Sequence, residues 1–288
     1  MANRRGMKWL IPLLALVALL PQRASAETTL GPAITTLPIT LSKAGVVYHF
    51  TKNLVYDSAV GTAIDIAGSD IVIDMNGYAL INTTGSNNTA NGIVCNSFNR
   101  VSVKNGSVVG FLNGVALTSE GAQVENLLVT NNFRTGIIVI GNNANIVNNR
   151  VNATGGSVNS AFDSFAAGIS LTGTYCNISD NEVHSTYTAD ITGRFGNGIR
   201  LNGCSNIVVS NNHVLDVEPI APTEATTTGI ATVSSDNLII LNNVVTSTQV
   251  GFDLSGGASG SYGDNITSTV ATGYFTSGSG MTSIGNNN

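Results

Sequence analysis

Three ionisable residues, Arg150, Glu182 and His213, stand at the same place in three successive copies of a short sequence pattern. A carboxyl group and an imidazole, assisted by a cation, are the groups that general acid–base catalysis uses when the fold brings them together. Parallel strands stacked at about 4.8 Å per copy would place the three residues one above another. The same residues could instead form an ordinary cross-strand charge row, which contributes roughly a few tenths of a kcal/mol per pair.

The ionisable residues near this row suggest chemistry on an acidic sugar. Elimination across a uronate needs a cation for the carboxylate, a base for the C5 proton and an acid for the leaving oxygen. The candidate cation is Arg200 or Arg194, the candidate base is His213 or His184, and the candidate acid is Tyr187 or Glu182. A carboxylate pair such as Asp190 and Glu218 could instead support glycoside hydrolysis. The candidate catalytic residues are His213, Glu182, Tyr187 and His184, and the candidate substrate-binding residues are Arg150, Arg194, Arg200 and Asp190.

The element that must position these groups is a repeat marked by a glycine before an apolar residue. Its glycines are Gly92, Gly114, Gly136, Gly168, Gly198, Gly229, Gly251 and Gly273. They are spaced by 22, 22, 32, 30, 31, 22 and 22 residues. A period near 22 residues is too short for paired-helix repeats and fits one coil of a parallel β-solenoid.

A second repeated pattern, or register, is six residues long: Val or Ile first, Asn or Asp third and Val sixth. It keeps a constant phase relative to the glycines. It predicts a corner row whose side chains tolerate a left-handed backbone, formed by Asn105, Asn126, Asn148, Asp180, Asn211 and Asn242. The period-two alternation between the registers predicts an inward ladder of Ile93, Val115, Ile137, Ile169, Ile199, Ile230 and Phe252.

Three adjacent coils carry long insertions after the second register, at residues 152–167, 184–197 and 215–228. Because all three leave from one corner, we expect them to form a wall on one face of the rod. The outward positions beside the insertions carry Arg150, Glu182 and His213 before them and Arg200 after them. These four residues are expected to form the floor of one shallow groove.

The chain is predicted to be one exported domain, located outside the cell, in the periplasm or at the cell surface. Residues 1–26 have the basic start, apolar run and Ala24-Ser25-Ala26 cleavage site of a secretory signal peptide. The apolar run is too short to span a bilayer, so no membrane span is expected. Residues 27–62 are expected to cap the N-terminal end, residues 63–275 to form the solenoid and residues 276–288 to be a ragged tail.

The net charge and the cysteine content limit which classes of partner and cofactor are expected. Without residues 1–26 the chain keeps 8 of its 12 basic residues against 17 acidic ones, a formal net charge of −9. Nucleic acid and anionic membranes require clustered Lys and Arg, so neither is an expected partner. Cys95 is expected to be a buried free thiol, and a disulfide between Cys176 and Cys204 is left open. No Cys and His cluster has the spacing of a zinc site, and no metal is expected.

The strings Gly45-Val46-Val47-Tyr48, Ile64-Asp65-Ile66 and Asp70-Ile71-Val72-Ile73-Asp74-Met75-Asn76-Gly77-Tyr78 are followed by repeats of the type Asn-Gly-Ile … Asn-Ile-Val-Val-Ser-Asn-Asn. Over residues 45–272 this sequence resembles the right-handed parallel β-helix proteins of the pectate-lyase-like superfamily. The resemblance implies an all-β, single-stranded, right-handed parallel β-helix, a solenoid that the length sets at roughly ten coils.

That superfamily contains polysaccharide lyases, epimerases, glycosidases, phage tailspikes and proteins without a known reaction, so the fold alone does not fix the activity. Its lyases commonly bind calcium through several carboxylates, but no motif here matches that arrangement, so no cofactor is expected, with calcium left open. We therefore expect a secreted protein whose groove binds an extracellular acidic polysaccharide, with cleavage or epimerisation left open. The alternative is a non-catalytic structural, adhesive or interaction protein that uses the solenoid as a rigid rod. The oligomeric state is left open.

Overall fold

The computed structural model describes residues 31–157, 165–187, 195–218 and 226–288. These residues form strands, turns and bends without any helix, and the strands join into one 26-stranded sheet. No helix in these ranges is therefore long and apolar enough to cross a membrane. The expected signal peptide, residues 1–26, lies outside the described residues.

The strands stack in three rows, which the chain visits in the order A, B, C within each coil. Row A consists of β2 (Ile39–Leu41), β5 (Thr62–Ile66), β8 (Asn91–Asn96), β10 (Asn113–Thr118), β12 (Thr135–Ile140), β15 (Phe165–Thr172), β18 (Phe195–Asn202), β21 (Thr226–Val233) and the second halves of β23 (Val244–Asp253) and β25 (Ile266–Phe275). Row B consists of β1 (Ala33–Ile34), β3 (Val47–Phe50), β6 (Val72–Asp74), the first halves of β9 (Ser102–Val109) and β11 (Gln123–Thr130), β13 (Asn145–Val147), β16 (Asn177–Ser179), β19 (Ser205–Ser210), β22 (Asp236–Leu241), β24 (Ser259–Gly263) and β26 (Gly280–Ser283). Row C consists of β4 (Leu54–Tyr56), β7 (Ala79–Asn82), the second halves of β9 and β11, β14 (Arg150–Gly155), β17 (Glu182–Tyr187), β20 (His213–Glu218) and the first halves of β23 and β25.

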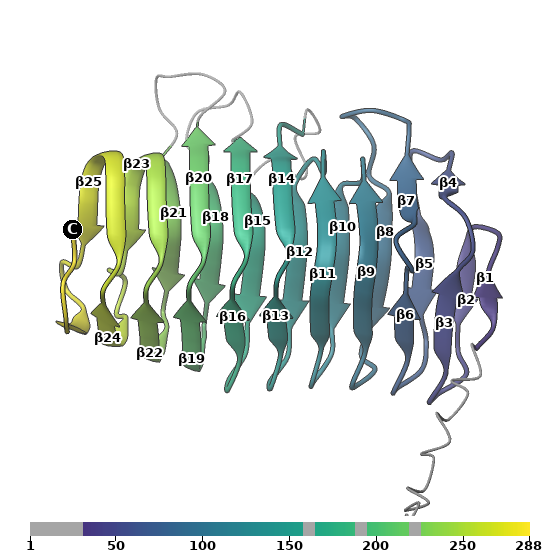
Figure 1. Ribbon diagram of the computed structural model, residues 1–288, viewed down its shortest axis with the longest axis horizontal. Coiled ribbons are helices and arrows are strands. Elements are labelled where there is room, and N and C mark those ends of the chain that lie inside the picture. The colour runs from purple at the N-terminus through teal and green to yellow at the C-terminus, as the bar shows by residue number, and fades with distance from the viewer. Residues whose placement is uncertain (1–30, 158–164, 188–194, 219–225) are drawn as a thin grey trace, which may run out of the picture.

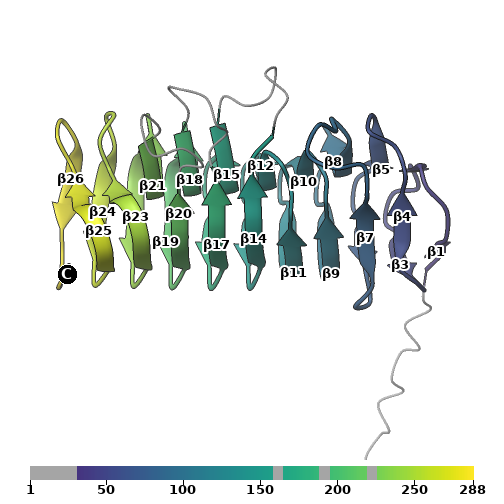
Figure 2. The same cartoon turned by 90° about the horizontal axis from the view of Figure 1, so that it is seen from above.

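The pairings within all three rows are parallel, so each strand lies beside its equivalent in the next coil. Figures 1 and 2 show the result as an elongated stack, with row C on one side, row A on the opposite side and row B along the lower edge in Figure 1. A chain that winds through the same three rows in every coil is a parallel β-helix. The expected solenoid of roughly ten coils is confirmed.

Both ends of the described chain continue the stack. Strands β1 to β4, within the segment expected to be a cap, pair in parallel with β3, β5, β6 and β7. Strand β26, within the segment expected to be a ragged tail, pairs in parallel with β24. Both segments therefore contribute strands in register with their neighbours.

The interior is the apolar ladder that the alternation predicts. Its members pair in register from coil to coil and are fully buried: Ile93, Val115, Ile137, Ile169, Ile199, Ile230 and Phe252. The three cysteines are also buried and carry free thiols, including Cys176 and Cys204. Burial raises the pKa of all three thiols, which makes them inert members of the core.

The repeating glycine makes room for the repeating valine of the second register. A Cβ added to Gly92, Gly114, Gly136, Gly168, Gly198 or Gly229 would lie within 3.0 Å of a γ-methyl carbon of Val108, Val129, Val151, Val183, Val214 or Val245, respectively. At Gly198 it would also lie 2.7 Å from the carbonyl oxygen of Gly229 in the next coil. Interiors are close-packed and do not accommodate such overlap. The two registers keep a constant phase because they pack against each other.

The corner row has the predicted left-handed backbone, with φ between 54° and 59° at Asn105, Asn126, Asn148, Asp180, Asn211 and Asn242. The residues that follow the corner row form a second ladder, which was not among the expectations from the sequence. Its members Asn149, Asn181, Asn212, Asn243 and Asn265 are at most 2% exposed. The recurring Asn after each corner residue, from Asn148-Asn149 onward, is the signal that could have revealed it.

Each buried amide of this second ladder is bonded to the next coil. The Oδ1 of Asn212 accepts hydrogen bonds from the backbone N–H and the Nδ2 of Asn181, at 3.1 and 3.0 Å. The Nδ2 of Asn212 in turn donates to Oδ1 of Asn243 at 3.0 Å and to the carbonyl oxygen of Ile178 at 2.9 Å. Because buried polar groups are costly when unpaired, this chain of amides fixes the register of adjacent coils.

Replacing Gly198 by Ala should lower the free energy of unfolding by about 1–3 kcal/mol, since the new methyl group overlaps backbone and a packed valine. The control is Gly273→Ala in the last coil, where the added Cβ would first meet Oγ1 of Thr267, at 3.2 Å. That side chain can rotate, so a change below about 0.5 kcal/mol is expected. Urea denaturation measures both values, and equal losses would contradict the packing account.

Replacing Asn212 by Ala should lower the free energy of unfolding by about 2–4 kcal/mol, because the buried backbone N–H of Asn181 loses its acceptor and the carbonyl oxygen of Ile178 loses a donor. Its sequence neighbour provides the control: Asn211 is exposed and has a φ of 56°, a conformation that glycine adopts freely. Asn211→Gly should therefore change stability by less than about 1 kcal/mol. Thermal unfolding followed by circular dichroism distinguishes the two, and a harmless Asn212→Ala would exclude a structural role for the ladder.

Candidate functional site

The charged row on row C forms as predicted. Glu182 pairs in register with Arg150 on one side and His213 on the other. The Nε of Arg150 lies 3.4 Å from Oε2 of Glu182, and the two side chains are 61% and 40% exposed. Ion pairs this exposed contribute little to stability. His213 is also exposed, so this row is a solvated surface feature.

The outward row on row A also has the predicted register, running through Ser170, Arg200, Ala231 and Asp253. Its position relative to the charged row differs from the expectation. Rows A and C lie on opposite sides of the stack (Figures 1 and 2), so outward side chains on the two rows diverge. The expectation of one groove with Arg150, Glu182, His213 and Arg200 on its floor is therefore wrong.

The physical reason lies in the coil corner from which the insertions leave. An insertion joins the end of a row C strand to the start of a row A strand, and the chain turns around the core between them. The strands extend into the expected insertion bounds of residues 152–167, since β14 runs from Arg150 to Gly155 and β15 begins at Phe165. Arg150 is therefore at the opposite end of β14 from the point where the insertion leaves, at a rise of roughly 3.3 Å for each residue of the strand.

The structure brings Arg200 together with Arg134 and Phe165. The guanidinium carbons of Arg134 and Arg200 each lie 4.8 Å from the centre of the Phe165 ring, a cation–π distance. Burial lowers the pKa of both guanidinium groups, and the charge of Arg200 lowers the pKa of Arg134 further. Two partly buried positive charges thus share one aromatic ring on row A.

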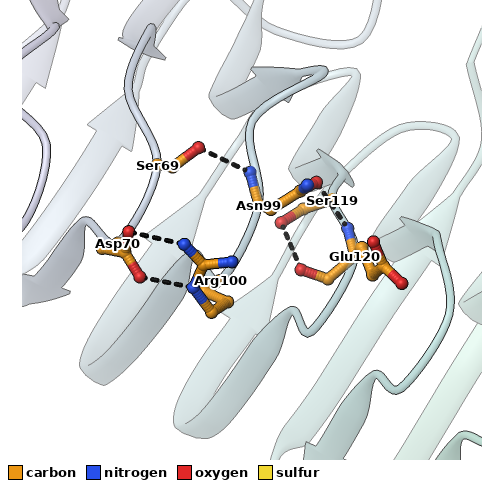
Figure 3. Close-up of polar contacts among 6 residues, drawn as sticks. All are labelled: Ser69, Asp70, Asn99, Arg100, Ser119 and Glu120. Carbon is orange, nitrogen blue, oxygen red and sulfur yellow. Dashed lines mark hydrogen bonds and ion pairs between the residues drawn. The ribbon is translucent and has the colours of Figure 1, made fainter.

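Among the described residues, Arg200 has no ion pair with a carboxylate, in contrast to Arg100 and Arg150. Arg100 forms a two-pronged ion pair with Asp70, in which Nη2 donates to Oδ2 at 2.8 Å (Figure 3). That partner holds the pKa of the Asp70 carboxyl below its usual range. Arg150 pairs with Glu182. Within the described ranges, no hydrogen bond or ion pair involves the guanidinium of Arg200.

A concave site of about 170 Å³ adjoins Arg200. It is lined by Phe195, Asn197, Arg200, Thr226, Thr228, Ala231, Thr232, Val233 and Asp253. Phe195 is 54% exposed and pairs in register with Phe165. The volume is below the roughly 300–1,000 Å³ of a drug-sized pocket, which makes it one subsite of an open surface.

Arg200 was expected from the sequence, whereas Arg134 and Phe165 were not. Phe165 and Phe195 both stand three residues before a repeat glycine, and this shared position was the available signal. Arg134 lies outside the stretched coils, so no sequence pattern linked it to Arg200. Only the parallel stacking of β12, β15 and β18 brings the group together.

The remaining candidates lie on row C or outside the described residues. His184 contacts Asp216, through Nε2 to Oδ2 at 3.1 Å, and Oγ of Ser185, through Nδ1 at 2.6 Å. Tyr187 is half-buried at the end of β17. Asp190 and Arg194 lie outside the described residues. Among the described residues, no group of three or more His, Cys, Asp or Glu is arranged to hold a metal ion.

Structural comparison finds three structures of two tailspike proteins among the most similar solved proteins. Dettilon tailspike protein gp208 matches 82% of this chain and 46% of its own, with 14% identity and a TM-score of 0.59. Tailspike protein 2 from an Escherichia coli O157:H7 bacteriophage matches 84% of this chain and 33% of its own, with 15% identity and a TM-score of 0.56. Its enzymatically active domain matches 90% and 38%, with 16% identity and a TM-score of 0.56. The chain thus spans less than half of each tailspike.

No curated protein sequence matches the chain. The family described as a right-handed beta helix region matches residues 113–288, more than half of the chain. The handedness that this description states agrees with the resemblance in sequence and with the parallel three-row coil of the structure. The protein therefore belongs to the right-handed parallel β-helix family.

Proposed function

We propose that row A binds an acidic polysaccharide, with Arg134, Phe165 and Arg200 as its central subsite. The observation that carries this proposal is the pair of partly buried guanidinium groups on the Phe165 ring, of which Arg200 has no carboxylate partner among the described residues. Burying positive charge is unfavourable unless an anion offsets the loss of hydration. A uronate carboxylate supplies that anion and can accept two parallel hydrogen bonds from one guanidinium.

The surroundings of the arginines suit a sugar ring. Phe195 exposes its ring beside the subsite, and an aromatic face attracts the weakly positive C–H groups of a pyranose. Asn197, Thr228 and Asp253 add polar groups that can bond to hydroxyl groups. The carboxylate of Asp253 is held by Ser255, whose Oγ donates to Oδ1 at 2.6 Å.

The proposed partner is extracellular, because residues 1–26 have the features of a secretory signal peptide. The mature chain is acidic overall, so a local cationic subsite would select anionic polymers at one place on the rod. The regular coil step of about 4.8 Å presents similar positions along row A, which suits an extended polymer.

The proposed function is binding, and cleavage or epimerisation by the expected residues does not follow from the arrangement. Elimination would need a base and an acid within hydrogen-bond reach of a sugar held by Arg200. His213, Glu182 and His184 lie on row C, on the opposite side of the stack. The use of the solenoid as a rigid rod is the competing function, and it predicts no glycan binding at Arg200.

Replacing Arg200 by Ala should weaken binding of polygalacturonate by roughly 1.5–3 kcal/mol, about 10- to 100-fold, because a charged bidentate contact is lost. Arg134→Ala should have a similar effect. Calorimetric titration measures both, with dextran as the neutral polymer that should not bind.

The matched control is Arg150→Ala, which removes the same type of side chain from the opposite side of the stack. Its affinity should equal that of the native protein. Unchanged affinity in Arg134→Ala and Arg200→Ala, or an equal loss in Arg150→Ala, would refute the row A site and favour the rigid-rod function.

A further inference from the structure

We propose that Ser185, His184 and Asp216 form a hydrolytic site for short O-acyl esters on row C. The site lies on the opposite side of the stack from the arginine subsite and does not depend on the binding function proposed above. It combines a serine, a neighbouring imidazole and a carboxylate that orients this imidazole. These are the parts of nucleophilic acyl transfer.

The hydrogen bonds assign a role to each nitrogen of His184. Nε2 lies 3.1 Å from Oδ2 of Asp216, so the neutral ring carries its proton there and donates it to the carboxylate. Nδ1 is then free to accept the hydroxyl proton of Ser185, whose Oγ is 2.6 Å away. The Oδ1 of Asn152 lies 3.2 Å from the same Nδ1 and can accept its N–H once the ring is protonated. The geometry is that of a serine activated by an oriented base, with the two ring nitrogens in exchanged roles relative to serine proteases.

The backbone presents Ser185 in an unusual conformation. Its φ is 53°, and a left-handed residue of this kind recurs at the same place in adjacent coils, at Ala153, Ser185, Asp216, Ser247 and Thr269. The left-handed bend is therefore a general feature of the coil. The pairing of a serine with a neighbouring histidine is specific to the coil of Ser185. In the coil of Ser247 the preceding residue is Thr246, so that serine has no histidine beside it on its own strand.

The surroundings indicate the class of ester. The side chains of His184 and Asp216 are 37% and 42% exposed, which leaves the site open to an ester carried by a polymer or another large alcohol. The apolar neighbour of His184 in its row is Leu215. A single leucine offers room for a short acyl group such as acetyl rather than for a fatty chain.

The reaction balances with water as the co-substrate. Oγ of Ser185 bonds to the acyl carbon while its proton passes to Nδ1 of His184. The carbon–oxygen bond to the alcohol then breaks, and the alcohol leaves with that proton. Water attacks the acyl-serine, gives a proton through His184 to the departing Oγ and releases the carboxylic acid.

A fluorophosphonate, which phosphonylates base-activated serines, tests the site in the full-length protein. Ser185 should be labelled, as located by peptide mass spectrometry, and Ser185→Ala should abolish the labelling. Ala153 adopts the same backbone conformation one coil earlier, so this variant should fold normally. His184→Gln should slow labelling at least tenfold. Asp216 is a positioning residue, so Asp216→Asn should also slow labelling of Ser185. Asp216→Glu, which keeps the carboxylate, should restore part of the labelling rate.

Ser247→Ala is the matched control and should be labelled at the native rate. Native protein should also hydrolyse 4-nitrophenyl acetate at least tenfold faster than 4-nitrophenyl octanoate. Labelling of the native protein no faster than of Ser185→Ala would overturn the hydrolytic site, and a preference for octanoate would overturn the short-acyl assignment. Because the arginine subsite is on the other side, neither result would alter polygalacturonate binding.

Discussion

The alignment of each coil with the next is the constraint on which the other features of this protein depend. Two contacts impose it: the repeat glycines leave space only for the valines of the second register, and the buried asparagines bond to their equivalents one coil away. A shift of one residue would turn the apolar ladder outward and leave buried amides unpaired. The three insertions are tolerated because they leave at the corner between rows C and A, away from the amide ladder.

This constraint also separates the chemistry of the two sides. The parallel rows bring outward side chains of adjacent coils together, so Arg134, Phe165 and Arg200 gather on the row A side, and His184 and Asp216 gather on row C. Residues that are close in sequence but separated by the turn around the core face away from each other. A polymer along row A and an ester on row C would therefore be handled independently.

The sequence predicted the features that repeat and missed those that depend on the path between repeats. The glycine and valine registers identified the parallel coil, and period-two alternation identified the inward ladder from Ile93 to Phe252 and the outward position of Arg200. The arrangement of faces was misjudged, because a repeat period does not give the angle through which the chain turns at a corner. The buried asparagine ladder and the pairing of Arg134 with Phe165 arise from contacts between coils, which single-residue patterns do not contain.

The central functional claim is that the two guanidinium groups on Phe165 receive one acidic sugar. The most direct measurement is a titration with oligogalacturonate, followed through the side-chain Nε–Hε resonances of arginine by NMR. The account predicts that the resonances of Arg134 and Arg200 shift together with one dissociation constant, while those of Arg100 and Arg150 stay in place. Shifts at Arg150 with Arg134 and Arg200 unmoved would contradict it.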